Sequence, residues 1–218
     1  MEFAAGAVHR PTSVDEVRAI VSGAAAAGRS VHAAGSRHSF STIADVAPGG
    51  VLVSTVDLNR VIAIDRDAMT VTVEGGIRYG DLSASLHAEG FALHNLPSLP
   101  HITVAGAVAT ATHGSGSRNG NLATAVLAVE LVVGDGTLVR LMHDDPRFAG
   151  AVVGLGALGV ATRLTLAVEP TFDVAQTIYP DLSLDAALAD LDAVMDAAYS
   201  VSLFTDYRRD VFQQVWWK

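Results

Sequence analysis

The sequence predicts an α+β fold, and three observations lead to this prediction. A capped helical pattern runs from Ser13 to Gly28, short β-like runs follow one another between Val51 and Glu74, and an Asp-Gly turn joins two further apolar runs. Of the 218 residues, 50% are hydrophobic and 17% are charged. A chain of this size and composition buries a core in one domain, or in one domain plus part of another.

The first helix has a start signal and a stop signal. Ser13 and Glu16 form a capping box, apolar residues then recur at helical spacing, and Gly28 ends the helix. A strand over residues 30–34 follows. Three more strands are expected over residues 51–54, 61–64 and 70–74.

The centre of the chain contains a second helix and a run of small residues. The helix is expected over residues 81–89, with Leu82 and Leu86 buried and Gly90 as its stop. Nearly all side chains in residues 103–116 are small, which suggests a helix. Such a helix suits either a flat ligand or tight packing of protein on protein, and both interpretations stay open.

A hairpin and a glycine-rich string come next. The Asp135-Gly136 turn joins β-like runs over residues 126–133 and 138–141. The string from Gly154 to Gly159 matches the dinucleotide fingerprint G-x-G-x-x-G, which requires a strand before it and a helix after it. Residues 164–168 have strand periodicity instead, so we reject a nicotinamide-binding Rossmann unit.

The last part of the chain looks like the start of a second domain. From Phe172 the composition becomes acidic and helix-forming, with β-like runs over residues 174–179 and 200–204 on either side. The chain ends in what reads as an amphipathic strand over residues 212–218. We expect this ending to leave apolar surface and unpaired strand edges, which favour aggregation.

The composition excludes several classes of function. A net charge of −9 gives no general attraction to nucleic acid or to anionic membranes. The absence of cysteine excludes disulfides, a thiolate nucleophile and cysteine-based metal sites. Residues 1–10 lack a secretion signal, and no segment approaches the roughly 20 apolar residues of a membrane span, so a cytoplasmic protein is the default expectation.

The candidate site is the stretch from Ala33 to Phe40, where a buried-looking run gives way to small, polar and reactive residues. Gly35 allows a turn whose backbone N–H groups can converge on a phosphate. The side chains that would assist are those of Ser36, Arg37 and Ser39. His38 would then lie beside whatever carries the phosphate. An ordinary strand-to-loop turn with a surface histidine fits these residues equally well.

Four motifs resemble a known family, the flavin oxidases of the vanillyl-alcohol-oxidase type with their FAD-binding PCMH-type domain. They are GSRHSF at 35–40, LPSLPHITVAG at 96–106, ATATHGSG at 109–116 and LGALGV at 155–160. Their order and their span over nearly the whole chain make the resemblance specific. The Ser-Leu-Pro-His and Thr-His-Gly-Ser-Gly runs are similar to those of the alditol (xylitol) oxidases within the family.

The resemblance implies a two-subdomain FAD-binding fold over residues 1–170 and the incomplete beginning of a substrate domain over residues 171–218. It also implies FAD, with His38 joined covalently to the 8α-methyl group and Ser98 as the catalytic residue that bonds the substrate hydroxyl near N5. The residues that it assigns to the cofactor are Ala33, Ala34, Gly35, Ser36, Arg37, His38, Ser39, Ser98, Thr103, Gly106, Thr110, Ala111, Thr112, His113, Val160 and Ala161.

The implied reaction moves hydride from the CH–OH group of a sugar alcohol to the flavin and then to O2, giving an aldose and hydrogen peroxide. Pro97 departs from the family, because a smaller residue is expected there in alditol oxidases. Two alternatives stay open. In family members the groups that hold the polyol lie beyond the position of Lys218, so the chain would be a truncated FAD-binding module without polyol turnover; otherwise it is a sugar-1,4-lactone oxidase of the same superfamily.

Metal binding is not expected. His101 and His113 are neighbours of the small-residue run, but no carboxylate accompanies them at ligand spacing. The expected partners are therefore a polyol and O2, with no nucleic acid and no membrane, and the sequence indicates no oligomeric state.

Overall fold

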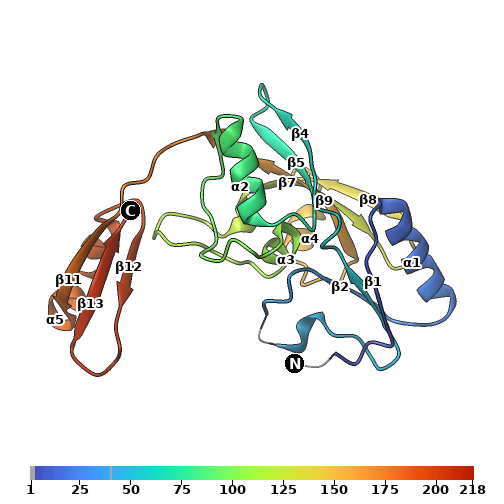
Figure 1. Cartoon of the computed structure of the whole chain (residues 1–218), viewed down its shortest axis with the longest axis horizontal. Helices are drawn as coiled ribbons and strands as arrows, with labels where there is room; N and C mark the ends of the chain where they lie inside the picture. Colours follow the sequence, from blue (N-terminus) through green and yellow to red (C-terminus); the bar gives the residue numbers. More distant parts are fainter. Residues whose placement is uncertain (1–2, 40) are drawn as a thin grey trace.

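The computed structural model describes residues 3–39 and 41–218, so Phe40 of the candidate site lies outside the described residues. Its strands form a three-stranded parallel sheet, a five-stranded antiparallel sheet, a two-stranded pair and a C-terminal three-stranded sheet (Figure 1). Helices lie beside these sheets, which confirms the α+β class that the sequence predicts. None of the helices in this part of the chain is long and apolar enough to cross a membrane.

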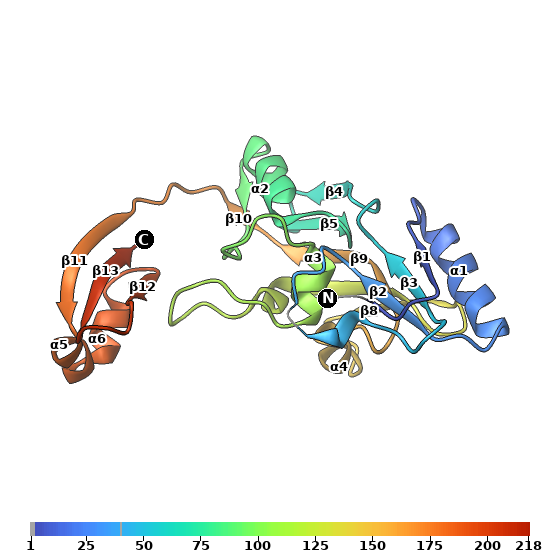
Figure 2. The same ribbon diagram turned by 60° about the horizontal axis from the view of Figure 1, so that its bottom comes forward.

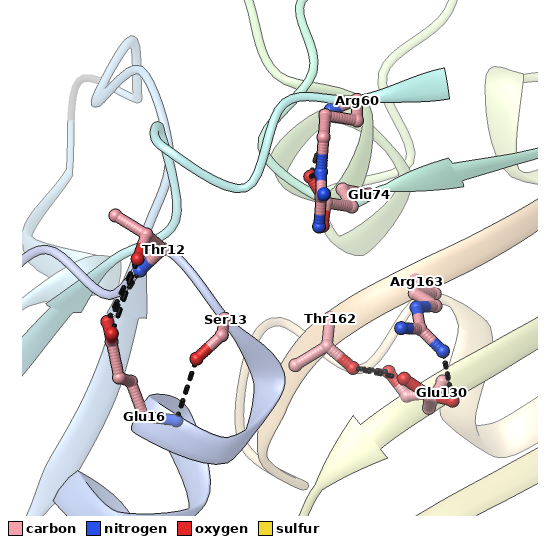
Figure 3. Close-up of polar contacts among 8 residues, drawn as sticks. All are labelled: Thr12, Ser13, Glu16, Arg60, Glu74, Glu130, Thr162 and Arg163. Carbon is pink, nitrogen blue, oxygen red and sulfur yellow. Dashed lines mark hydrogen bonds and ion pairs between the residues drawn. The ribbon is translucent and has the colours of Figure 1, made fainter. Parts of the chain in front are cut away.

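The parallel sheet contains β1 (Ala7–His9), β3 (Val51–Ser54) and β2 (Val31–Ala34) in that order. Helix α1 (Val14–Ala26) packs on it through Val17 and Val21, which are almost completely buried. The predicted capping is confirmed in part. Ser13 Oγ accepts the Glu16 N–H at 3.2 Å, but the Glu16 carboxylate accepts the N–H of Thr12 at 2.8 Å, one residue earlier than a capping box requires (Figure 3).

The five-stranded sheet has the order β4 (Val61–Asp65), β5 (Thr70–Glu74), β9 (Val160–Ala167), β7 (Val126–Val132), β8 (Leu138–Met142). All of these strands are predicted from the sequence, including the β7–β8 hairpin, whose turn places Gly136 at φ +85°. Because β9 follows the Gly154–Gly159 string directly and helix α4 (Phe148–Val152) precedes it, the structure confirms that no Rossmann unit begins there.

A row of alternating charges crosses this sheet (Figure 3). Glu74 is 1% exposed and accepts from Arg60 Nη2 at 2.7 Å, Arg163 lies opposite both Glu74 and Glu130, and Thr162 Oγ1 donates to Glu130 at 2.8 Å. Burial tends to raise the pKa of Glu74, but the hydrogen bonds from Arg60 outweigh this and hold the pKa below its usual value. Shifting β9 by one residue would separate Arg163 from Glu74 and Glu130 and leave these carboxylates opposite uncharged residues, so the row favours the observed register.

Helices α2 (Tyr79–Ala88) and α3 (Val104–Ala109) pack on the same core, and Leu82 and Leu86 of α2 are fully buried as predicted. The predicted helix over residues 103–116 is wrong beyond Ala109. Thr110 is its C-cap, Ala111 takes a left-handed φ of +52°, and a loop follows up to the short helix η2 (Leu122–Ala125).

The C-terminal part lies at the opposite end of the molecule from α1 (Figures 1 and 2). It follows the pair β6 (Phe91–Ala92) and β10 (Glu169–Pro170) and a stretch without regular structure over residues 171–176. Its elements are β11 (Thr177–Ser183), α5 (Leu184–Ala189), α6 (Leu191–Asp196), β12 (Val201–Phe204) and β13 (Val211–Trp217).

Strand β13 is the central strand of its sheet, between β11 and β12. The predicted unpaired edges of the last strand are therefore wrong, because both of its edges carry antiparallel partners. Exposed apolar surface is present on its neighbours, where Ile178 is 49% and Phe204 45% exposed. Aggregation of this sheet stays a prediction.

Candidate functional site

A cleft of about 670 Å³ opens where the turn after β2, helix α3 and the loop before β9 meet. Binding pockets for whole ligands have volumes of roughly 300–1,000 Å³, so this cleft is of the size that holds a ligand. Its walls come from segments that are far apart in the sequence. The packing of the parallel sheet against the five-stranded sheet therefore creates it.

The turn after β2 has the geometry that the sequence predicts. A side chain at Gly35 would place its Cβ 2.1 Å from Thr103 Oγ1, so only glycine fits against the segment that leads into α3. Arg37 has a left-handed φ of +56°, and a left-handed residue in a turn makes successive backbone N–H groups point to one side. The Thr103 N–H donates to Ser36 Oγ at 3.3 Å and joins the two walls.

Thr103 carries a buried polar atom that has no partner within residues 3–39 and 41–218. The residue is 1% exposed and occupies the N-cap position of α3, yet its hydroxyl does not cap the helix. Leaving a buried hydroxyl unpaired costs about 1–3 kcal/mol. Because Thr103 lines the cleft, a ligand bound there is in position to supply the missing hydrogen bond.

The lining of the cleft is positive or neutral in charge. It includes Arg37 and the histidines His32, His38 and His113, and no described lining residue is an aspartate or glutamate. The chain as a whole has a net charge of −9. A cleft without carboxylates in so acidic a protein suits an anionic ligand such as a pyrophosphate.

Helix α3 turns its smallest side chains toward the cleft. Ala105, Gly106 and Ala109 line it, whereas Val104 and Val108 face the core. Thr110 Oγ1 donates to the Gly106 carbonyl at 3.0 Å and so keeps its own side chain close to the helix. The cleft side of α3 therefore carries only small side chains, as the flat-ligand interpretation of the small-residue run expects, and binding of a flat ligand there stays a prediction.

Two histidines meet at the rim of the cleft. His101 Nε2 lies 3.5 Å from His38 Nδ1, and the two rings are edge to face with their centroids 5.2 Å apart. Among the described residues, no three histidine, aspartate or glutamate side chains group as metal ligands do. That the chain binds no metal stays a prediction, since the structure carries no ions.

Most of the residues assigned to FAD from the sequence lie together around this cleft. Those that line it are Ala33, Gly35, Ser36, Arg37, His38, Ser39, Ser98, Thr103, Gly106, Thr110, Thr112, His113 and Ala161. Three assigned residues do not line it. Ala34 lines an adjoining cavity, Ala111 lies between two lining residues, and Val160 is 2% exposed in the core beneath α1.

The sequence-based assignment misses one wall of the cleft. Leu155 and Gly156 line it together with His32, and a side chain at Gly156 would place its Cβ 2.5 Å from the His32 ring. The signal was available in the Gly154–Gly159 string, because several glycines close together indicate a close approach of the backbone to another group. The family resemblance includes residues 155–160, but around that stretch it assigns only Val160 and Ala161 to the cofactor and so misses Leu155 and Gly156.

Comparisons with known proteins agree with this geometry. The model of a family described as FAD binding domain matches residues 5–142. An alditol oxidase from Streptomyces sp. is 50% identical over 216 residues, which cover 99% of this chain and 51% of the relative. L-gulonolactone oxidase from Mus musculus is 36% identical over 187 residues, which cover 85% of this chain and 42% of the relative.

Solved structures show the same fold. Cholesterol oxidase from Brevibacterium sterolicum superposes with a TM-score of 0.85 at 19% identity, over 96% of this chain and 44% of that one. An alkyldihydroxyacetonephosphate synthase gives 0.78 at 21% identity, over 89% of this chain and 38% of that one. The chain thus spans about half or less of the length of the proteins it matches.

Proposed function

This chain belongs to the family of FAD binding domains, and from that premise we propose that it forms the flavin-binding part of an oxidase acting on sugar alcohols. The cleft is the observation that supports FAD binding. It contains a turn suited to phosphate and an unpaired buried hydroxyl, and its described lining contains no carboxylate. The substrate class rests on the alditol oxidase relative, which is 50% identical across 99% of the chain.

The proposed placement of FAD follows the chemistry of the cleft walls. The turn at Gly35 to Arg37 would hold the pyrophosphate, because its N–H groups, hydroxyl and guanidinium all favour negative charge. Helix α3 would lie along the flat part of the cofactor. Thr103 would donate its unpaired hydroxyl to a cofactor oxygen or nitrogen.

His38 and Ser98 have separate proposed roles at the rim. His38 would carry the covalent link to the 8α-methyl group, and Ser98, which is exposed and lines the cleft, would bond the substrate hydroxyl. When bound, FAD accepts the hydride from the CH–OH carbon and passes the electrons to O2, which becomes hydrogen peroxide. The chain's own contribution is orientation of the cofactor and of the hydroxyl group.

We also propose that residues 1–170 form the FAD-binding domain and residues 171–218 the beginning of a substrate domain. The irregular stretch over residues 171–176 supports this division. So does the separate sheet that follows it, where Val201 and Val215 of the sheet and Ala187 of α5 are buried. A cytoplasmic location belongs to the same proposal.

The two alternatives differ from this proposal in what they predict for activity. A lactone oxidase is favoured by the relationship to L-gulonolactone oxidase, at 36% identity. A flavin-binding module without turnover stays the other alternative; the chain spans 51% of the alditol oxidase.

The test is hydrogen peroxide production by the FAD-loaded chain with xylitol, sorbitol and L-gulono-1,4-lactone, each against a blank without substrate. The proposal predicts a yellow protein that forms peroxide faster with the polyols than with the lactone. A preference for the lactone would favour the lactone oxidase, and a yellow protein inactive on all three would favour the module. A colourless preparation that FAD does not reconstitute would contradict every version.

A further inference from the structure

We propose that His101 is a positioning residue for His38, and that it takes up the proton that His38 loses when the flavin becomes attached to it. This inference rests on the proposed function, in which His38 is the covalent anchor. It concerns a residue that the resemblance does not assign to the cofactor. It also explains why two loops bring two histidines together at the rim of the cleft.

The contact joins two loops that lie 63 residues apart in the sequence. His38 belongs to the turn after β2, and His101 belongs to the loop before α3. Their ring nitrogens, His38 Nδ1 and His101 Nε2, are 3.5 Å apart, with the ring planes at 75°. Catalytic hydrogen bonds are often this long without ligand and shorten once the ligand is in place.

The backbone on both sides of His101 is held in place by the first turn of α2. The Gly80 N–H donates to the Pro100 carbonyl at 2.8 Å, and the Tyr79 N–H donates to the Ile102 carbonyl at 3.1 Å. Tyr79 is 2% exposed, so this anchor point is part of the core. His101 is therefore presented from a fixed position, which is what a residue that orients another side chain requires.

The pair stands between two cavities. His38 lines the proposed flavin cleft, whereas His101 lines a second cavity of about 660 Å³, and the turn from Gly35 to Arg37 borders both. Asp57 and Asp81 line the second cavity together with Arg10, Arg37 and Arg78, whereas no described residue of the flavin cleft is a carboxylate. A proton that passes from His38 to His101 thus moves from the flavin side to a cavity that contains a carboxylate.

The attachment step shows why such an acceptor is needed. One C–H bond of the 8α-methyl group and the N–H bond of His38 are replaced by a C–N bond. The two protons and two electrons released go to dioxygen, the oxidant of the proposed oxidase, as hydrogen peroxide. A neutral imidazole has one N–H and the N-substituted product has none, so His38 must lose this proton, and a second neutral imidazole accepts it readily near neutral pH.

The experiment follows covalent attachment rather than turnover. The chain is prepared without flavin and mixed with FAD, and the flavin that stays with the acid-precipitated protein is measured over time. We expect His101→Ala to slow attachment by about 10-fold or more while reversible FAD binding stays within about two-fold of the original. His101→Gln should be equally slow, because an amide does not take up a proton at these pH values.

Added imidazole should restore attachment in His101→Ala, an effect that a purely structural role would not produce. His143→Ala is the matched control, because His143 is exposed and lines neither cavity, and it should attach flavin at the original rate. Attachment at the original rate in His101→Ala, or restored by His101→Gln, would overturn the inference and leave the proposed function standing. Flavin retained by His38→Ala would instead overturn the anchor itself.

Discussion

Replacing Thr103 with valine separates the stability of the empty chain from its affinity for FAD. The Thr103 hydroxyl is buried and unpaired, and valine removes it while keeping the branched shape. Without flavin the variant should be more stable than the original, because it no longer buries an unpaired polar group. With flavin this advantage should shrink, because the hydroxyl of the original chain finds its partner on the cofactor.

The magnitudes follow from the geometry. Removing an unsatisfied buried hydroxyl is worth about 1–3 kcal/mol. The valine methyl group that replaces the hydroxyl is bulkier, and it faces Gly35. Space is short there, since a Cβ added at Gly35 would lie 2.1 Å from Thr103 Oγ1, so crowding reduces this gain. We expect about 1 kcal/mol, which raises the melting temperature of a chain of this size by roughly 2–4 °C. Losing one hydrogen bond of about 0.5–1.5 kcal/mol should weaken FAD binding by roughly 2-fold to 10-fold.

The assay is urea unfolding with and without FAD, carried out in a His38→Ala background so that the flavin binds reversibly. Bound ligand stabilises the folded chain by RT ln(1 + [L]/Kd), so the gain produced by FAD measures its affinity. Thr103→Ser is the control, because it keeps the hydroxyl and should keep the full gain. A Thr103→Val chain that is no more stable when empty, and that gains as much from FAD as the original, would refute the reasoning.

Two further predictions concern the turn at Gly35 and the ion pair between Glu74 and Arg60. Gly35→Ala should lower stability by about 1–3 kcal/mol through overpacking against Thr103 and should weaken FAD binding, as measured by unfolding and by flavin titration; unchanged values in both would contradict the turn geometry. Glu74→Gln should lower the melting temperature at pH 7 and have less effect at pH 3.5. The folded-state pKa of Glu74 lies below its usual value, so the carboxylate stabilises the fold above about pH 4.3 and this stabilisation is lost as the pH falls through the folded pKa. An equal effect at both pH values would argue against the ion pair with Arg60.

Local signals in the sequence predict most of the secondary structure. Gly28 ends α1 with a φ of +65°, and the Arg29 N–H donates to the Ala24 carbonyl at 2.9 Å, a bond typical of helix ends at glycine. The Asp135-Gly136 turn specifies its hairpin in the same way, through residues adjacent in the chain. Such features depend on neighbours that the sequence shows directly.

Features that depend on residues far apart in the sequence are harder to predict from it. Strand β1 has three residues, with Val8 63% exposed, so its period-2 pattern is too short to recognise; its parallel pairing with β3 defines it. The central place of β13 depends on β11 and β12, and the sequence does not show which strands pair. The helix-forming segment predicted between the last two β-like runs forms two helices, because the Asp190 side chain accepts the Ala193 N–H at 3.2 Å and starts a new helix.

The features of the candidate site also fall into two groups, those that the sequence shows and those that only the folded chain shows. The turn at Gly35 is visible in the sequence, because its residue types suit a phosphate. The unpaired hydroxyl of Thr103, the wall at Gly156 and the contact between His38 and His101 all arise from segments that meet only in the folded chain. Sequence motifs thus indicate which residues belong to the candidate site, whereas the structure identifies the buried atom among them that lacks a partner.

The most direct test of the central claim is the mass of the denatured chain after incubation with FAD. If the cleft binds FAD and His38 anchors it, the original chain should gain the mass of the flavin attached and remain fluorescent after acid precipitation. His38→Ala should bind FAD reversibly, as shown by protection against urea, but have only the mass of its polypeptide. A flavin-sized increase in the His38→Ala chain, or no FAD binding by the original chain, would contradict the claim.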